Sequence, residues 1–242
     1  MAAVPAPETW EVGGWLCRRR PGTNVGRANS ASYLGPPRPG SNHFPDDVIR
    51  SIAERGHAPR FRITPLAPPG VTSLLAAAGY GTGRPVLVMT ARLPREPVGP
   101  RRGPAPLTGD ATSGWRSLYL SGYPEAEGRS RLELAEDAPH PRRFAEIVTR
   151  TETAGVGLGV LGDGTLGIFD VMTAPAHRRR GIASRVVESL LAWGSEAGGD
   201  LAYLQVASDN HAAVRLYERL GFTTAYEYCY ASSGGAPTGS PR

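Results

Sequence analysis

Residues 171–184 read VMTAPAHRRRGIAS, and this stretch decides how the second half of the chain folds. A short β-rich run ends in a proline turn, and three arginines and Gly181 follow. Apolar residues then recur at helical spacing, which indicates a helix that begins near Gly181. The free N–H groups of a first helical turn and the positive end of the helix dipole both favour an anion. The stretch therefore predicts a phosphate-binding turn.

The residue types within this turn support the same interpretation. Gly181 lets the backbone approach a ligand because it has no Cβ. Arginine side chains add charge-assisted hydrogen bonds to phosphate oxygens. The alternative is a solvated patch of charge, but the proline before it and the Gly-Ile-Ala after it favour a phosphate site. We expect His177, in the same turn, to be exposed.

A second block, QVASDNHAAVRLYERLGF, spans residues 205–222. Asn210 is placed to cap a helix that Gly221 ends. Tyr217 lies on that helix, where it either packs in the core or presents a hydroxyl with a chemical role. Capping by Asn210 and contact with a ligand are compatible with each other.

The two blocks together carry a resemblance. Arg178-x-x-Gly181-x-Ala183 resembles the Arg/Gln-x-x-Gly-x-Gly/Ala signature of the GNAT superfamily of N-acetyltransferases. The family's later block, Asn-x-x-Ala-x-x-Leu-Tyr-x-x-x-Gly-Phe, is matched at every spacing by Asn210, Ala213, Leu216, Tyr217, Gly221 and Phe222. The first half more weakly resembles the degenerate N-terminal lobe of a group of actinobacterial two-lobe GNAT proteins.

This resemblance implies an α/β fold with a GNAT-like mixed, twisted sheet flanked by helices and a partial GNAT-like N-terminal lobe. We expect a partial, degenerate lobe over residues 1–93 and a linker over 94–111. A catalytic GNAT domain over 112–232 and a disordered tail over 233–242 then follow.

Individual elements are expected from periodicity and turn signals. Strands are predicted over 14–19, 28–34, 61–64, 85–93, 155–161, 165–173, 201–206 and 222–230. Helices are predicted over 45–55, 73–78, 115–120, 141–150, 181–192 and 212–220.

The resemblance also implies a donor and the residues that hold it. Acetyl-coenzyme A would be the co-substrate, and no metal is implied. The pyrophosphate turn of the family corresponds here to Arg178, Arg179, Arg180, Gly181, Ile182, Ala183 and Ser184. Its pantetheine-binding residues correspond to Val171, Met172, Thr173 and Asn210. Tyr217 corresponds to a tyrosine that lies against the cofactor and protonates the departing thiolate.

The catalytic base is not fixed by the resemblance. In related bacterial enzymes that acetylate a ribosomal protein, a glutamate base occupies the position of Gln205, and a glutamine accepts no proton. Asp170, near the end of the strand that leads into the turn, is the first alternative. Glu152, Glu227 and water stay open as weaker ones.

The expected reaction is acetyl transfer to a primary amine of a small molecule or peptide by direct attack in a ternary complex. A non-catalytic acyl-coenzyme A sensor, a longer acyl chain, and a protein N-terminal or lysine acetyltransferase stay open. Acidic residues are frequent in the region of about 112–155, where acceptor loops are expected, and they favour a cationic acceptor by charge complementarity. These residues are Glu125, Glu127, Glu133, Glu136 and Asp137.

The bulk properties exclude several other classes. The net charge is +5 over 242 residues, all 27 basic residues are arginines, and most are scattered. Nucleic-acid binding is therefore not expected, because it concentrates basic residues on one face. Cys17 and Cys229 have no metal-ligand spacing. No secretory signal or membrane-spanning run is present in the sequence, so we expect no membrane partner and a cytoplasmic location, with a homodimer left open.

Overall fold

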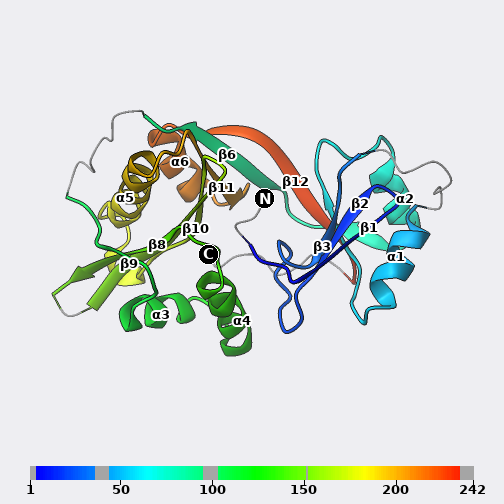
Figure 1. The fold of residues 1–242 in the computed structure, drawn as a ribbon, viewed down its shortest axis with the longest axis horizontal. Coiled ribbons are helices and arrows are strands. Elements are labelled where there is room, and N and C mark those ends of the chain that lie inside the picture. The colour runs from blue at the N-terminus through cyan, green and yellow to red at the C-terminus, as the bar shows by residue number, and fades with distance from the viewer. Residues whose placement is uncertain (1–3, 36–43, 95–102, 151, 235–242) are drawn as a thin grey trace.

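The computed structural model describes residues 4–35, 44–94, 103–150 and 152–234, which form two lobes that share one twisted sheet (Figure 1). The sheet has 12 strands in the order β1-β2-β3-β4-β12-β6-β11-β10-β9-β8-β7, with β5 also paired to β12. The long strand β12 (Thr223–Ser233) joins the lobes. Its first half pairs with β6, and its second half pairs with β4 and β5. One continuous strand therefore fixes the two halves of the chain to each other.

The first lobe is small and mixed. Its elements are β1 (Glu8–Val12), β2 (Trp15–Arg19), β3 (Ser30–Tyr33), α1 (Asp46–Ala53), β4 (Arg60–Ile63), α2 (Val71–Ala77) and β5 (Tyr80–Thr82). Trp15, Phe61 and Leu75 lie at the centre of its core and are at most 1% exposed. The strand predicted over 14–19 and the helix predicted over 45–55 are present as β2 and α1. The strand β1 lies where no element was predicted.

The second lobe holds the remaining elements. They are β6 (Val86–Arg92), β7 (Leu107–Thr108), α3 (Ser113–Leu120), α4 (Glu125–Glu136), β8 (Arg142–Thr149), β9 (Glu152–Gly162), β10 (Thr165–Thr173), η1 (Pro175–His177), α5 (Ile182–Glu196), β11 (Leu201–Ala207) and α6 (His211–Arg219). The strand β6 precedes the expected linker in sequence, yet it lies between β11 and β12 in the sheet. The first part of the chain therefore contributes a strand to the second lobe.

Helices cover both faces of the second lobe's sheet (Figure 1). The helices α5 and α6 pack on one face around a core that includes Leu166, Leu190 and Phe222. The helix α3 packs on the opposite face, around a core that includes Trp115 and Phe144. The indole Nε1 of Trp115 donates a 3.1 Å hydrogen bond to the carbonyl of Gly157, which fixes α3 against β9.

Glycines on β9 bring α5 close to the sheet. A Cβ at Gly157 would lie 2.5 Å from Cγ1 of Val186, and one at Gly159 would lie 3.0 Å from Cδ2 of Leu190. Gly155 meets Ile182 still more closely. Residues two apart on a strand and residues four apart on a helix are separated by similar distances along the element. The three glycines on one face of β9 can therefore each pack against one of three helical side chains that are four residues apart. This packing fixes the N-terminus of α5 beside the end of β10.

The expected fold class, a mixed twisted sheet flanked by helices, is confirmed. The predicted helix over 141–150 is wrong, because these residues form β8 and pair with β9 along its length. The helix α4 occupies residues for which no element was predicted. Residues 95–102 of the expected linker and 235–242 of the expected tail lie outside the described residues.

Candidate active site

The turn between β10 and α5 leaves the N-terminus of the helix without a side-chain cap. Arg179 and Gly181 both have positive φ, +61° and +78°, so the backbone reverses twice before α5 begins. Gly181 is the N-cap and has no side chain to accept a hydrogen bond from the first turn. The first N–H groups of α5 are therefore available to an anion. The side chains of Arg178, Arg179 and Arg180 are exposed around them.

His177 anchors this turn to the neighbouring strand. Its Nε2 lies 2.6 Å from Oε1 of Glu152, the first residue of β9, and the residue is only 8% exposed. The expectation that His177 is exposed is wrong, because the 3-10 turn η1 folds it inward against β9. Glu152, one of the weaker candidates for the base, is thereby engaged in holding the turn.

The strands β10 and β11 separate beside this turn. Their paired residues run from Thr165↔Leu201 to Ile168↔Leu204, although each strand continues for several residues beyond. On the other edge, Met172 and Thr173 still pair with β9. The β11-facing edge of Val171–Thr173 thus carries backbone groups without a strand partner. Such an edge can pair with the amide groups of an extended ligand.

Asn210 and Tyr217 lie on α6, which follows β11. Asn210 is the N-cap of α6, and its Oδ1 accepts a 3.2 Å hydrogen bond from the N–H of Ala213. Tyr217 is buried with its ring against Phe222, and burial raises the pKa of its phenol to about 12. No described residue forms a hydrogen bond with this hydroxyl. Tyr217 therefore stays protonated at neutral pH and can donate.

A β-bulge in β10 turns the side chain of Asp170 toward the face of the sheet that α3 covers. The register with β9 shifts between Phe169 and Met172, and Asp170 has a φ of +54°. Phe169 packs in the core beneath α3, and Asp170 also points there, where Oδ1 accepts a 3.1 Å hydrogen bond from Tyr119. Burial raises the pKa of the Asp170 carboxyl, while the positive charge of Arg27 and the bond from Tyr119 oppose the rise.

Asp170 lines a pocket between the two lobes. The pocket has a cavity volume of only about 20 Å³ and opens to solvent. The first lobe contributes Val4, Val25 and Arg27, and the second contributes Tyr119, Arg131, Leu134, Ala135, Leu158, Phe169 and Asp170. Asp170 alone among these was selected from the sequence. Nothing in the local sequence marks Arg27 or Tyr119, because the pocket forms only when distant segments meet.

Comparisons with known proteins assign part of the chain to a family. The sequence profile of the acetyltransferase (GNAT) family matches residues 112–222. The uncharacterized N-acetyltransferase YobR of Bacillus subtilis is 26% identical over 240 residues, which cover 95% of this chain and 94% of that protein.

Residues 112–222 belong to the GNAT superfamily.

Solved GNAT structures share the fold of the whole chain. A GCN5-related N-acetyltransferase from Kribbella flavida superposes with a TM-score of 0.69 at 16% identity, over 96% of this chain and 91% of that one. A tandem GNAT protein from the clavulanic acid biosynthesis pathway superposes with a TM-score of 0.59 at 16% identity, over 86% of this chain and 76% of that one. Residues 112–222 thus form a domain of the acetyltransferase (GNAT) family, and the first lobe precedes this domain in the chain.

The residue at the usual base position of related GNAT enzymes has another contact here. Oε1 of Gln205 accepts a 2.7 Å hydrogen bond from the hydroxyl of Tyr228 on β12. Burial raises the pKa of Tyr228, so its hydroxyl keeps the proton that it donates. The guanidinium of Arg62 lies 4.0 Å from the centre of the same ring. Gln205 thus belongs to the packing where the lobes join, and it accepts no proton.

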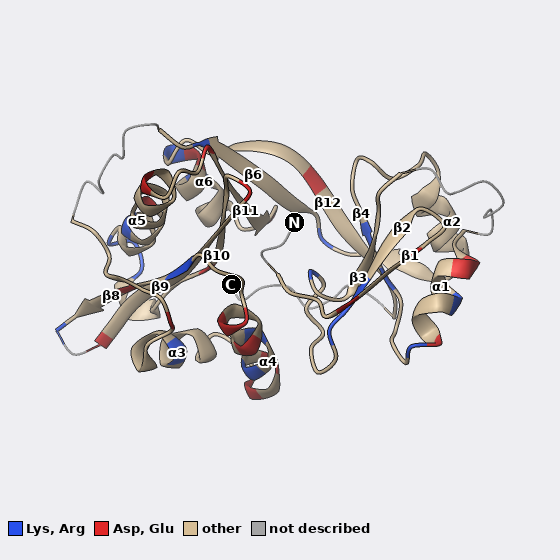
Figure 2. Ribbon diagram, viewed as in Figure 1, with Lys and Arg blue, Asp and Glu red and all other residues tan. Residues whose placement is uncertain are grey.

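The acidic residues of α4 are largely compensated within the GNAT protein. Red and blue segments alternate along α4 in Figure 2. Glu125 pairs with Arg129, Glu127 with Arg131, Glu136 with Arg116, and Asp137 with Arg20 of the first lobe. These carboxylates therefore offer less attraction to a cationic acceptor than their number in the sequence suggests.

The described residues contain no helix that is long and apolar enough to cross a membrane. Within them, no three or more His, Cys, Asp or Glu side chains gather closely enough to hold a metal ion.

Proposed function

We propose that this protein transfers the acetyl group of acetyl-coenzyme A to a primary amine of a small molecule or peptide, by direct attack in a ternary complex. One observation carries the proposal: the uncapped N-terminus of α5 adjoins the separated ends of β10 and β11, where the bulge places Asp170. An anion site, an open strand edge and a carboxylate meet at the end of one strand.

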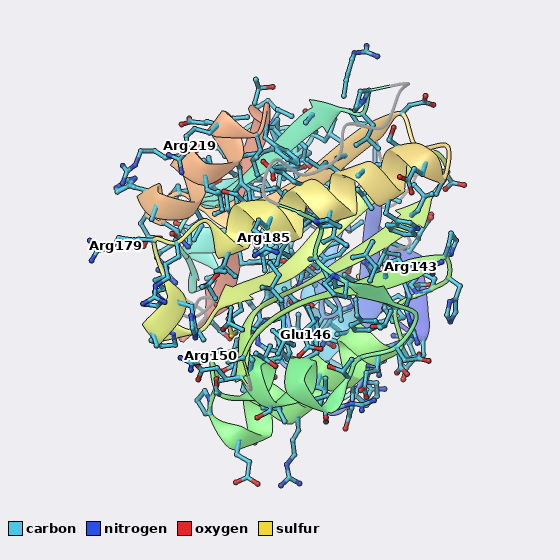
Figure 3. All side chains as sticks on the ribbon, turned by 90° about the vertical axis from the view of Figure 1, so that its left-hand side faces the viewer. Arg143, Glu146, Arg150, Arg179, Arg185 and Arg219 are labelled. Carbon is cyan, nitrogen blue, oxygen red and sulfur yellow. The ribbon has the colours of Figure 1, made fainter. Side chains whose placement is uncertain are left out.

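The turn before α5 suits the phosphates of acetyl-coenzyme A. The N–H groups from Gly181 to Ser184 would hold the pyrophosphate, because helix N-termini bind phosphate. Figure 3 shows Arg179 from this turn and Arg219 from α6 projecting toward the same side of the molecule. Two guanidinium groups on one side of the helix N-terminus would add charge-assisted hydrogen bonds to the phosphates.

The pantetheine arm would lie along the free edge of Val171–Thr173. Backbone amides there would pair with the arm as a neighbouring strand does. Asn210, which already caps α6 through its side-chain oxygen, would contribute its amide nitrogen. This arrangement would direct the thioester to the bulge.

Bound acetyl-coenzyme A supplies an acyl group activated as a thioester. Asp170 takes the proton of the acceptor amine, directly or through one water, so that the nitrogen can attack the acyl carbon. Tyr217 donates its proton to the sulfur as the carbon–sulfur bond breaks and the carbon–nitrogen bond forms. The raised pKa values of both groups suit these roles, since they make Asp170 a stronger base and keep Tyr217 protonated.

The two cysteines support direct attack over a covalent acyl-enzyme. Cys17 is buried in the core of the first lobe, and burial raises the pKa of its thiol to about 12. Burial also raises the pKa of Cys229 on β12. A thiol is nucleophilic only as the thiolate, so neither is activated to carry the acetyl group.

Calorimetric binding of acetyl-coenzyme A, followed by thiol release with a panel of primary amines, tests the proposal. We expect binding that is lost when Arg179 and Arg180 are replaced by Ala, and turnover with at least one amine. Mass spectrometry of the product locates the added acetyl group. Binding of acetyl-coenzyme A without thiol release from any amine would contradict the proposed enzyme activity and favour a non-catalytic acyl-coenzyme A sensor. Competition between acetyl and longer acyl-coenzyme A thioesters determines the chain length.

A further inference from the structure

The loop between β2 and β3 lies at the junction of the lobes (Figure 1) and carries Arg27, which lines the pocket. Arg18 donates a 3.0 Å hydrogen bond to the carbonyl oxygen of Arg27. Asn29 spans the loop, accepting from the N–H of Arg20 and donating to the carbonyl of Thr23. Such a network fixes the backbone on both sides of Arg27.

The same loop is packed tightly against its neighbours. Gly26 lies against the ring of Tyr230, and a Cβ there would come within 2.7 Å of Cζ. Val25 packs with Leu134 of α4. The loop is therefore a built wall of the pocket between the lobes.

The guanidinium of Arg27 enters that pocket with its hydrogen-bonding capacity unused. Its carbon lies 5.1 Å from the centre of the Phe169 ring, and its charge acts on Asp170. Within the part of the chain that the structure describes, no group accepts a hydrogen bond from it or forms an ion pair with it at 4.0 Å or less. A guanidinium carries five N–H donors, and leaving them without acceptors in a partly buried site is costly.

The other cation of the pocket is already committed. Arg131 pairs with Glu127 at 2.8 Å and lies over the ring of Tyr123. The remaining walls are largely apolar and include Val4, Leu134 and Leu158. The pocket thus presents one carboxylate, on Asp170, and one guanidinium without an acceptor, on Arg27, beside apolar side chains at a site that opens to solvent.

We propose that this pocket selects an acceptor with a carboxylate next to its amine, an α-amino acid or a related amino-carboxylate. Arg27 binds the carboxylate in a two-pronged contact, and the amine faces Asp170. This inference rests on the proposed acetyl transfer and names its class of acceptor. It also gives the first lobe a direct part in the reaction, since Arg27 is supplied by that lobe.

The test uses matched acceptors on the full-length protein. Amino acids, each paired with the amine left after removal of its carboxyl group, are assayed by thiol release at saturating acetyl-coenzyme A. We expect the amino acid to have the higher kcat/KM, by about 10- to 100-fold, because a guanidinium–carboxylate contact is strong.

Arg27→Gln should raise the KM for the amino acid by about 10-fold or more, and it should lower kcat/KM far more for the amino acid than for its decarboxylated partner. A smaller effect common to both acceptors is expected, because the charge of Arg27 also acts on Asp170. Arg27→Lys should restore part of the difference, since lysine keeps the charge without the fork. Arg55→Gln is the matched control, because Arg55 is an exposed arginine of the same lobe that also lies over an aromatic ring. Melting temperatures check folding, and Arg27→Lys carries the comparison if Arg27→Gln does not fold.

Two results would overturn the inference while leaving acetyl transfer intact: decarboxylated amines outperform amino acids in the unmodified protein, or Arg27→Gln slows both classes equally. The second would make Arg27 only a counter-charge for Asp170. If no amine releases thiol, calorimetry measures the binding of each amino acid and of its decarboxylated amine in the presence of coenzyme A. Binding of amino acids that depends on Arg27 would support the pocket without the reaction, and equal binding of both classes, or none, would overturn it.

Discussion

The hydroxyl of Tyr119 donates a hydrogen bond of 3.1 Å to Oδ1 of Asp170, from a helix on one face of the sheet to a bulge in its central part. Tyr119 stacks on Trp115 one turn earlier in α3, and Trp115 is itself bonded to β9. The proposed base is therefore oriented by a helix that is fixed to the strand beside it. Burial raises the pKa of the Tyr119 hydroxyl, so it remains a donor at neutral pH.

Replacing Tyr119 by Phe should shift the acidic limb of the pH–rate profile to higher pH. The bond from Tyr119 lowers the pKa of Asp170, so its loss raises that pKa, and the carboxyl gains its proton at a higher pH. Arg27 and Arg131 keep their opposing influence, and Tyr123 stays nearby as a neutral phenol. The measurement is kcat/KM against pH. A limb that does not move would remove Asp170 from the role of base.

Replacing Tyr217 by Phe should lower kcat by about 100-fold or more, the usual contribution of a general acid, with little change in the Kd for acetyl-coenzyme A. The ring that packs on Phe222 is retained, so stability should hold. Single-turnover rates and calorimetry with both proteins separate the two effects. Equal turnover by the two proteins would assign Tyr217 to the core alone.

Local sequence signals were sufficient for the elements that repeat a clear period. The helix α5 has its buried residues Ile182, Val186 and Leu190 four apart, and it begins where the turn signals place it. Residues 141–150 are the instructive failure. Phe144, Ala145, Ile147 and Val148 follow a helical spacing, yet these residues form a strand. They pair with β9, which begins directly after them at Glu152, and this pairing within the sheet overrides the local spacing.

The missed helix α4 did leave a signal. Glu125 and Arg129, and Glu127 and Arg131, are acid–base pairs four residues apart, and both pairs form in the structure.

The residues of the candidate site also divide into those that local sequence predicts and those that it does not. The turn at Gly181 and the cap at Asn210 are local features, whereas the aim of Asp170 depends on the bulge, and Arg27 comes from another lobe. No spacing rule relates Arg27 to Asp170, which lies 143 positions later in the chain.

Gly157→Ala should destabilise the protein by about 1–3 kcal/mol, the usual cost of overpacking a core. Its Cβ would lie 2.5 Å from Val186, so α5 would have to move away from the sheet. Gly162→Ala is the matched control at the end of the same strand, where a Cβ meets nothing within 4 Å. Denaturant unfolding measures both. Equal stability of the two variants would contradict the close packing of α5.

Breaking the pair between His177 and Glu152 should weaken acetyl-coenzyme A binding modestly. The pair anchors the phosphate turn, but the Glu152 side chain is 66% exposed, so its contribution should be about 0.2–1 kcal/mol, a few-fold in Kd. His177→Ala, Glu152→Gln and the double variant form a cycle, and calorimetry should give less than additive losses. Strictly additive losses would mean that the two residues act independently.

Asn210 allows capping and cofactor contact to be separated. Asn210→Ala removes the acceptor for the N–H of Ala213 and should cost about 0.5–2 kcal/mol of stability. Asn210→Ser keeps a capping oxygen and removes the amide nitrogen, so its stability should stay close to that of the unmodified protein. If the amide nitrogen contacts the pantetheine arm, both variants bind acetyl-coenzyme A more weakly, but only Asn210→Ala has a lower melting temperature. Serine with full affinity would show that Asn210 acts on the cofactor only by starting α6 in the right place.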